Sequence, residues 1–188
     1  MKKSNIFISG FTLIELLISI SIIGMVSALF YTNYRATARQ NILSAASHQL
    51  AGDLRLVQGY ASGAKKNNGS VPKGGWGIYL ATTSANYIIF TDDDESKDYN
   101  FVSELYKSVD FPANVGVDAI EVTKWDGTSV TGSSTVSVVF LPPDPKTFIT
   151  TDYGLDSIDN ILKLTLKDNI NQTVRTLLIN YFGLIDVQ

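Results

Sequence analysis

The feature that most constrains this chain is an apolar run near its amino terminus. Residues 11–31 are mostly Ile, Leu, Phe, Val, Ser and Ala, and Glu15 is the only charged side chain between residues 4 and 34. As an α-helix rising about 1.5 Å per residue, this run spans about 30 Å, which is the hydrocarbon thickness of a bilayer. The sequence therefore predicts a transmembrane helix over residues 11–34, surrounded by membrane lipid.

An ordinary secretory signal is the alternative interpretation of this run. Such a signal has an apolar stretch of only ~7 to 15 residues followed by small residues, and residues 26–28 (Val-Ser-Ala) would supply them. Glu15 argues against it, because a carboxylate inside a bilayer costs ~2.5 to 3.5 kcal/mol and marks a functional site with a partner. No Lys, Arg or His lies within one helical turn of Glu15. Its partner then belongs to another molecule, or Glu15 lies close enough to the interface to reach water.

Composition excludes several classes of function. The chain has no cysteine and one histidine, His48, which rules out disulfide scaffolds, thiol catalysis and zinc sites built from several Cys or His ligands. No Gly-x-Ser-x-Gly, Walker or Rossmann spacing is present, so we expect no enzyme. Residues 63–188 carry ten basic and sixteen acidic side chains, so a nucleic-acid partner is not expected for this part.

The helix is predicted to continue beyond the apolar run as an amphipathic segment over residues 35–62. Apolar residues three or four apart form one stripe along it, and His48 lies on the opposite, polar side. Gly59, Gly63 and the polar residues 65–70 end the helix near residue 62. The stripe consists of Leu43, Ala46, Leu50, Leu54, Val57 and Ala61.

Strand and turn signals dominate residues 63–188. Within residues 115–125 we expect Val115, Val117, Ala119 and Glu121 on one side, and then a turn at Asp126-Gly127 that leads into residues 134–141. The last two strands are predicted to form a terminal hairpin. The predicted strands cover residues 77–80, 87–91, 115–125, 134–141, 161–166 and 174–181. Together with the helix they predict an α+β fold, in which one antiparallel sheet packs on the apolar stripe.

One loop is a candidate for a metal site. Asp92, Asp93 and Asp94 are followed closely by Glu95 and Asp98, and Ca²⁺ takes six to eight oxygen ligands in proteins. The spacing is not that of an EF-hand, so a solvated acidic loop is the favoured interpretation. Ca²⁺ is the only cofactor that the sequence suggests.

Residues 10–17, Gly-Phe-Thr-Leu-Ile-Glu-Leu-Leu, follow a short basic leader and closely resemble the processing signature of type IV pilins and type II secretion pseudopilins. The resemblance implies that a prepilin peptidase cuts between Gly10 and Phe11 and methylates the Phe11 amine. Residues 1–10 would be the leader, and residues 11–34 the core helix of a filament. Glu15 would be an assembly contact that pairs with the Phe11 amine of a neighbouring subunit.

The same resemblance implies a location and partners. Basic residues flank the apolar run on both sides, so charge alone leaves its orientation open. Family membership would place residues 1–10 in the cytoplasm and the carboxy-terminal domain outside a bacterial inner membrane. The partners would be other pilin subunits and an inner-membrane assembly platform.

Further likenesses lie in the carboxy-terminal domain. Residues 75–78 (Gly-Trp-Gly-Ile), 138–142 and 179–183 are similar to the H class of minor pseudopilins and related minor pilins. Residues 143–145 (Pro-Asp-Pro) stand where these proteins usually carry a glycine. A minor filament subunit is therefore the first expectation. A major pilin of an adhesive, motility or DNA-uptake fibre, or an exported binding domain on an uncleaved anchor, are the alternatives.

Overall fold

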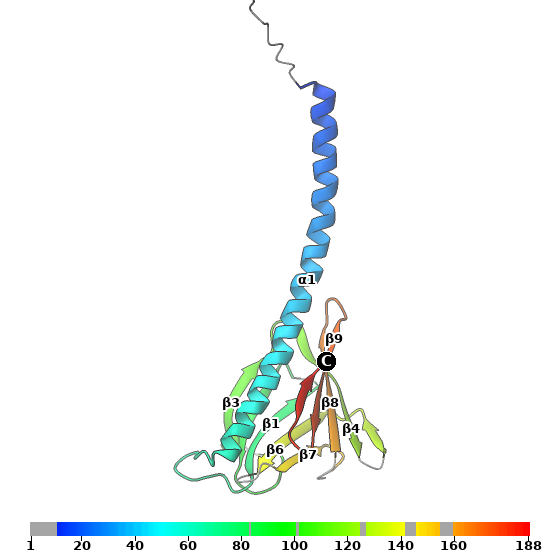
Figure 1. The fold of residues 1–188 in the computed structure, drawn as a ribbon. Coiled ribbons are helices and arrows are strands. Elements are labelled where there is room, and N and C mark those ends of the chain that lie inside the picture. Colours follow the sequence, from blue (N-terminus) through cyan, green and yellow to red (C-terminus); the bar gives the residue numbers. More distant parts are fainter. Residues whose placement is uncertain (1–10, 83, 101, 125–126, 142–145, 155–159) are drawn as a thin grey trace, which may run out of the picture. The chain divides into compact units, whose positions relative to one another are not determined.

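The structure is a computed structural model that describes residues 11–82, 84–100, 102–124, 127–141, 146–154 and 160–188, without the side chains of residues 32, 33, 35 and 36. Gly10 and the rest of the predicted leader therefore lie outside the described residues. The chain divides into two compact units, residues 1–38 and 39–188. Helix α1, Leu13–Ser62, contributes to both units, and the second unit contains all the described strands (Figure 1).

The end of α1 has a clear stereochemical cause. Ala64 adopts a left-handed conformation with φ of 46°. The Ala64 amide donates to the Ala61 carbonyl at 3.0 Å, and the Lys65 amide donates to the Tyr60 carbonyl at 2.9 Å. These two bonds form a Schellman motif, which satisfies carbonyls that the helix leaves unpaired. The predicted end near residue 62 is confirmed, and the motif brings Lys65 back toward Tyr60.

The predicted apolar stripe of α1 is buried, with each of its six side chains no more than 2% exposed. Ser47 and Ala51 are buried beside it, and the Ser47 hydroxyl donates to the Ser44 carbonyl of the same helix. His48 is exposed, as its place on the polar side of the helix predicts. Residues 43–61 therefore supply one wall of the core.

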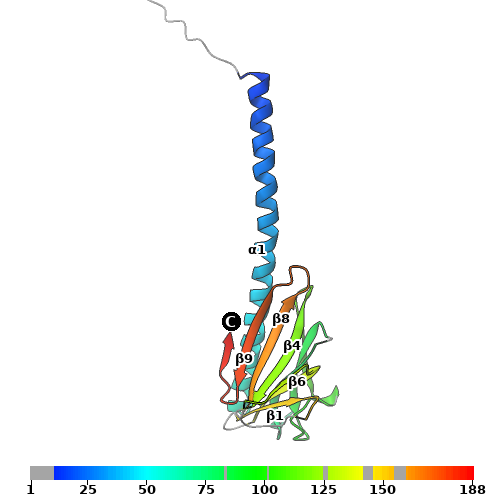
Figure 2. The ribbon, with the colours of Figure 1, turned by 90° about the vertical axis from the view of Figure 1, so that its right-hand side faces the viewer.

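The strands form two antiparallel sheets, so the prediction of a single sheet is wrong. Figure 2 shows β9, β8 and β4 of the second sheet side by side. The first sheet has the order β3 (Leu105–Asp110), β2 (Asn86–Asp92), β1 (Gly75–Ala81), β6 (Thr135–Leu141), β7 (Lys146–Thr151). The second has the order β10 (Ile185–Val187), β9 (Val174–Asn180), β8 (Asn160–Asp168), β4 (Val115–Lys124), β5 (Ser129–Thr131).

Two predicted connections need correction. Strand β4 pairs with the short strand β5, whereas β6 pairs with β1 and β7 in the other sheet. A turn signal specifies a reversal of the chain but not which strand pairs next, and Asp126 itself lies outside the described residues. Strands β8 and β9 pair as the predicted hairpin, but it is not terminal, because β10 adds to β9.

The predicted alternation along β4 is also wrong in its second half. The register between β4 and β8 shifts between Val117 and Ala119. A bulge inserts one residue and so reverses which side chains face the core. Val115 and Val117 are buried as predicted, but beyond the bulge Ile120 and Val122 are buried in place of Ala119 and Glu121.

One hydrophobic cluster joins α1 to both sheets, which confirms the predicted α+β fold. From β1 it includes Trp76, Ile78 and Leu80, and from β8 it includes Leu162, Leu164 and Leu166. Gly77 faces the other side of β1, where a Cβ would lie 2.7 Å from the Phe90 ring. The first sheet is therefore packed on both faces, as buried Phe90 and Val139 also indicate.

Candidate functional site

The first candidate site is the apolar part of α1. Leu13–Tyr31 is long and apolar enough to cross a membrane, and none of it is buried. Ser19 and Ser21 lie within it, and their hydroxyls donate to the carbonyls of Glu15 and Leu17, each at 2.8 Å. Such back-bonding to the preceding turn satisfies a hydroxyl within its own helix. These two serines therefore need no outside partner in an apolar environment.

Glu15 lies in the first turn of this helix. The Glu15 amide donates to the Thr12 hydroxyl at 3.3 Å, and the Leu16 amide donates to the Thr12 carbonyl at 3.2 Å. Thr12 thus caps the helix, and a carboxylate at the third helical position is favourable there because the helix dipole is positive at its amino end. In the part of the chain that the structure describes, no ion pair involves Glu15.

Phe11 and Glu15 are four residues apart, so both belong to the first turn or its entrance, and Phe11 is 77% exposed. Their predicted roles as the methylated residue and the assembly contact stay predictions. Gly10, on the other side of the predicted cleavage bond, lies outside the described residues.

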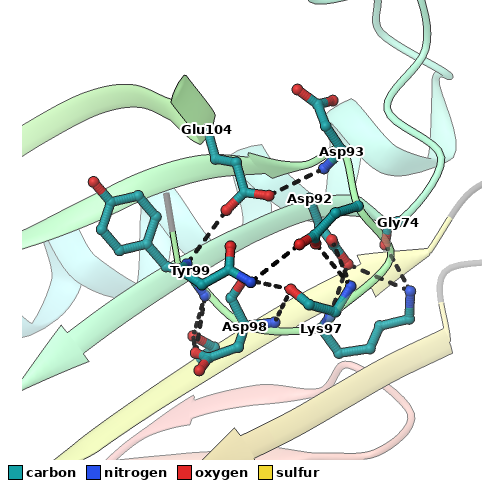
Figure 3. Close-up of polar contacts among 11 residues, drawn as sticks. Gly74, Asp92, Asp93, Lys97, Asp98, Tyr99 and Glu104 are labelled. Carbon is teal, nitrogen blue, oxygen red and sulfur yellow. Dashed lines mark hydrogen bonds and ion pairs between the residues drawn. The ribbon is translucent and has the colours of Figure 1, made fainter. Parts of the chain in front are cut away.

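The second candidate site is the acidic loop after β2 (Figure 3). Asp92, Asp94 and Glu104 bring carboxylate oxygens within 4.8 Å of one another. Asp92 and Glu104 are buried, whereas Asp94 is exposed. Asp93, which the sequence suggested as a third ligand, is not in this group, because its amide rather than its carboxylate points to Glu104, at 3.4 Å. Glu104 was missed because it belongs to the short 3₁₀ helix η1 (Val102–Glu104), ten residues further along the chain.

Donors within the protein already meet these carboxylates. Asp92 accepts hydrogen bonds from the Ser96 and Lys97 amides, both at 3.0 Å, and lies 3.4 Å from the Lys97 ammonium. The Asn100 amide group donates to Asp94 at 3.1 Å. Burial raises the pKa of Asp92, although the bonds and charge of Lys97 act to lower it. Hydrogen bonds from Ser96 and Asn100 lower the pKa of the exposed Asp94.

The same loop covers the outer face of the first sheet. The Tyr99 ring lies 5.5 Å from the Phe90 ring and 5.4 Å from the Tyr79 ring, centroid to centroid. The Ser137 hydroxyl of β6 donates to Asp98 at 2.6 Å, and the Tyr99 amide donates to the Ser137 hydroxyl at 3.3 Å. The carboxylates therefore hold this loop in place, and Lys97 is the counterion of Asp92. Calcium binding at Asp92, Asp93 and Asp94, the alternative to a solvated acidic loop, is a question that a calcium titration with an EDTA control would test.

Comparison with known proteins gives one result for this chain. Residues 8–31 match the family described as the prokaryotic N-terminal methylation motif. The match contains Phe11, Thr12 and Glu15 together with the whole apolar segment. No curated protein and no solved structure matches the chain.

Proposed function

We propose that this chain is a subunit of a type IV pilus-like or type II secretion pseudopilus filament, with a structural rather than a catalytic role. The observation that carries the proposal is the N-terminal methylation motif over residues 8–31. This motif implies processing by a prepilin peptidase and assembly with other pilin subunits. The bond to be cut would be Gly10–Phe11, and Phe11 would carry the methyl group.

The exposure of the first unit supports assembly. Leu13–Tyr31 has none of its residues buried, so its large apolar side chains need a bilayer or neighbouring helices to remove them from water. The Ser19 and Ser21 hydroxyls bond within the helix, and Glu15 is the one charged side chain in this segment, so its carboxylate is the charge that a neighbour would have to neutralise. A positive amine on Phe11 of an adjacent subunit would do so.

Within this family we propose the role of a minor subunit, related to the H class of pseudopilins. The supporting features are Gly75-Trp76-Gly77-Ile78, where Gly75 has φ of 106° and Gly77 packs under Phe90. Before assembly the protein would sit in the inner membrane as a single-pass anchor, with residues 39–188 outside the cytoplasm. Docking on an inner-membrane assembly platform would precede its entry into a filament.

The mature amino terminus tests this proposal. We expect amino-terminal peptide mass spectrometry of the protein from its native cells to find N-methylated Phe11, with Lys2 and Lys3 removed. The matched variant Gly10→Ala should accumulate as the uncleaved chain, because a Cβ before the bond hinders the approach of the peptidase. A mature chain beginning at Leu29 would establish an ordinary signal peptide instead. One beginning at Met1 would establish an uncleaved anchor, and either result would reject the proposal.

A further inference from the structure

Three aromatic rings from distant parts of the chain meet at the end of α1. Tyr60 comes from the last turn of α1, Trp76 from β1 and Tyr106 from the edge strand β3. Their centroids are 5.1 Å apart for Tyr60 and Trp76, 5.0 Å for Trp76 and Tyr106, and 6.3 Å for Tyr60 and Tyr106. The interplanar angles are 62°, 83° and 80° in the same order. Rings at such large interplanar angles meet edge to face rather than in a parallel stack. We call Tyr60, Trp76 and Tyr106 the aromatic cage.

The ammonium group of Lys65 occupies this cage. Its Nζ lies 3.4 Å from the Tyr60 centroid, 4.7 Å from that of Tyr106 and 5.3 Å from that of Trp76. A cation within about 6 Å of a ring face is attracted by the ring quadrupole. Nζ also donates to the Tyr106 hydroxyl at 2.9 Å. Within the described residues no carboxylate forms an ion pair with Lys65, so the ring faces and the Tyr106 hydroxyl provide the attraction for the cation.

The backbone of Lys65 is fixed independently of its side chain. The indole N–H of Trp76 donates to the Lys65 carbonyl at 3.1 Å, and the Schellman motif holds the Lys65 amide on Tyr60. Trp76 is fully buried, whereas Tyr106 is 41% exposed. The cage walls are thus built by the fold, and the side of Tyr106 is open to solvent. The ammonium is carried on a flexible four-carbon stem that can leave without unfolding the walls.

We propose that the aromatic cage is a binding site for an alkylammonium group, and that Lys65 fills it as an intramolecular plug that an external ligand displaces. Ring faces favour a large, diffuse cation such as a quaternary ammonium. A metal ion is a poor occupant because Ca²⁺ and Mg²⁺ require several oxygen ligands, and the cage offers the two tyrosine hydroxyls. The ligand class is therefore a choline-type or a lysine-type ammonium.

The plug sets the apparent affinity. A tethered competitor such as the Lys65 ammonium acts at an effective concentration in the millimolar range. The apparent affinity for an external ligand falls in proportion to the fraction of molecules whose site is open. Lys65→Ala removes the competitor while leaving its carbonyl bond to Trp76. It should therefore tighten the binding of an external ammonium by about tenfold or more.

The test is a titration of the full chain in maltoside micelles, followed by Trp76 fluorescence in a Trp125→Phe background. Choline represents a lipid headgroup, and butylammonium represents a lysine side chain. The ligand that binds more tightly identifies which of these two sources supplies the ammonium group. We expect these ammonium ligands to bind saturably to the Lys65→Ala variant and more weakly to the wild-type protein. The control variant Lys66→Ala, which alters the neighbouring exposed lysine, should bind them with the same affinity as wild type. Tyr106→Leu in the Lys65→Ala background should abolish binding because it removes one wall.

A neutral analogue of choline, 3,3-dimethylbutan-1-ol, separates cation binding from simple burial of an apolar group. Equal binding of this alcohol, or equal affinities of wild type and Lys65→Ala for choline, would overturn the proposal. A second measurement uses the wild-type protein and so does not depend on how the variants fold. If choline displaces Lys65 from the cage, the rate of Lys65 acylation by a water-soluble reagent should rise when choline is added. An unchanged rate would equally overturn the proposal.

Discussion

At the scale of single residues, burial and charge act in opposite directions on Asp92. Its side chain is fully buried, and this burial raises the pKa of Asp92 more than the Lys97 amide and ammonium lower it. A carboxyl group with a higher pKa in the folded than in the unfolded chain binds more protons when folded. Its contribution to stability is complete below the unfolded pKa, near about 3.9, and is lost as the pH rises through the folded pKa.

We therefore expect the contribution of Asp92 to the free energy of unfolding to fall as the pH rises above about 4, by about 1.4 kcal/mol for each unit by which its pKa is raised. Asp92→Asn should lose less stability over the same interval because its side chain does not ionise. The pKa of Asp94 is lowered, so its contribution to stability has the opposite sign and is lost as the pH falls. That loss occurs below about pH 4, outside the interval in which Asp92 acts.

Thermal unfolding followed by circular dichroism, on the full chain in micelles between about pH 4 and pH 7, measures this effect. Asp93→Asn is the matched control, because Asp93 is the adjacent but exposed carboxylate. The control should follow the wild-type dependence on pH. If Asp92→Asn also follows it, burial does not dominate at Asp92.

The acidic loop also shows what the sequence can and cannot reveal about a site. A run of carboxylates was visible, but the sequence does not show which of them point inward. Asp92, the last residue of β2, is buried, whereas Asp93, one residue later, is exposed and presents its amide to Glu104. Glu104 joins the group through a chain reversal. Spacing alone specifies neither the reversal nor Lys97 as the counterion.

At the scale of elements, α1 changes character where the second unit begins. The second unit starts at Arg39, whose guanidinium donates to the Ala113 carbonyl at 3.5 Å, and the buried stripe starts at Leu43. Tyr87 of β2 donates a hydrogen bond to Asp53 further along the helix. Residues 39–62 therefore carry the described contacts that tie α1 to the sheets.

We predict that a chain beginning at Arg35 folds as a soluble monomer with the strand content of the full chain. Removal of residues 11–34 deletes the exposed apolar segment but none of the hydrophobic core, whose first helical member is Leu43. Circular dichroism and size-exclusion chromatography measure the outcome. A matched chain beginning at Gly52 lacks Leu43, Ala46, Leu50 and Ala51 and should not fold. Failure of the longer chain to fold would show that the apolar segment contributes to the fold.

Periodicity predicted α1 well because a buried stripe repeats over five turns, but the predicted strands omit β3, β5, β7 and β10. Strand β7 was missed although burial alternates along it, whereas the other three strands offer no such pattern. Five of the six residues of β3 are exposed, on both faces of the strand, and only Val109 is buried, so no alternation marks it. Strands β5 and β10 have three residues each, which is too short for a period to register. The bulge in β4 arises from pairing with β8, and so only the tertiary structure reveals it.

At the scale of the whole molecule, charge and apolar surface are divided along the sequence. Residues 1–62 carry five basic and two acidic side chains, whereas residues 63–188 carry ten basic and sixteen acidic ones. The exposed apolar segment contains a single charge, Glu15, which forms no ion pair within the described residues. The sequence showed this division directly, because it depends on composition rather than on contacts. Composition did not predict that the strands form two sheets, because packing in the folded chain determines which strands pair.

The expected assembly role of Glu15 can be tested by removing its carboxylate. If Glu15 pairs with the Phe11 amine of an adjacent subunit, then Glu15→Ala should block incorporation into filaments while leaving residues 39–188 folded and the Gly10–Phe11 bond cleaved. Removing one partner of a buried ion pair costs ~3 to 5 kcal/mol because the other charge is stranded, which is a factor of ~10² to 10³ or more in association. Glu15→Gln should fail similarly, since an amide cannot neutralise an amine.

Co-purification of each variant with sheared filaments, or with partner pilins, measures incorporation. Ser19→Ala is the matched control one turn further along α1. Its hydroxyl donates only to the Glu15 carbonyl of its own helix in the contacts described, so its loss strands no charge. The control should therefore incorporate at the wild-type level. If both Glu15 variants are incorporated at the wild-type level, this carboxylate is not an assembly contact. If Ser19→Ala also fails to be incorporated, the cause is a general defect of the helix rather than a missing ion pair.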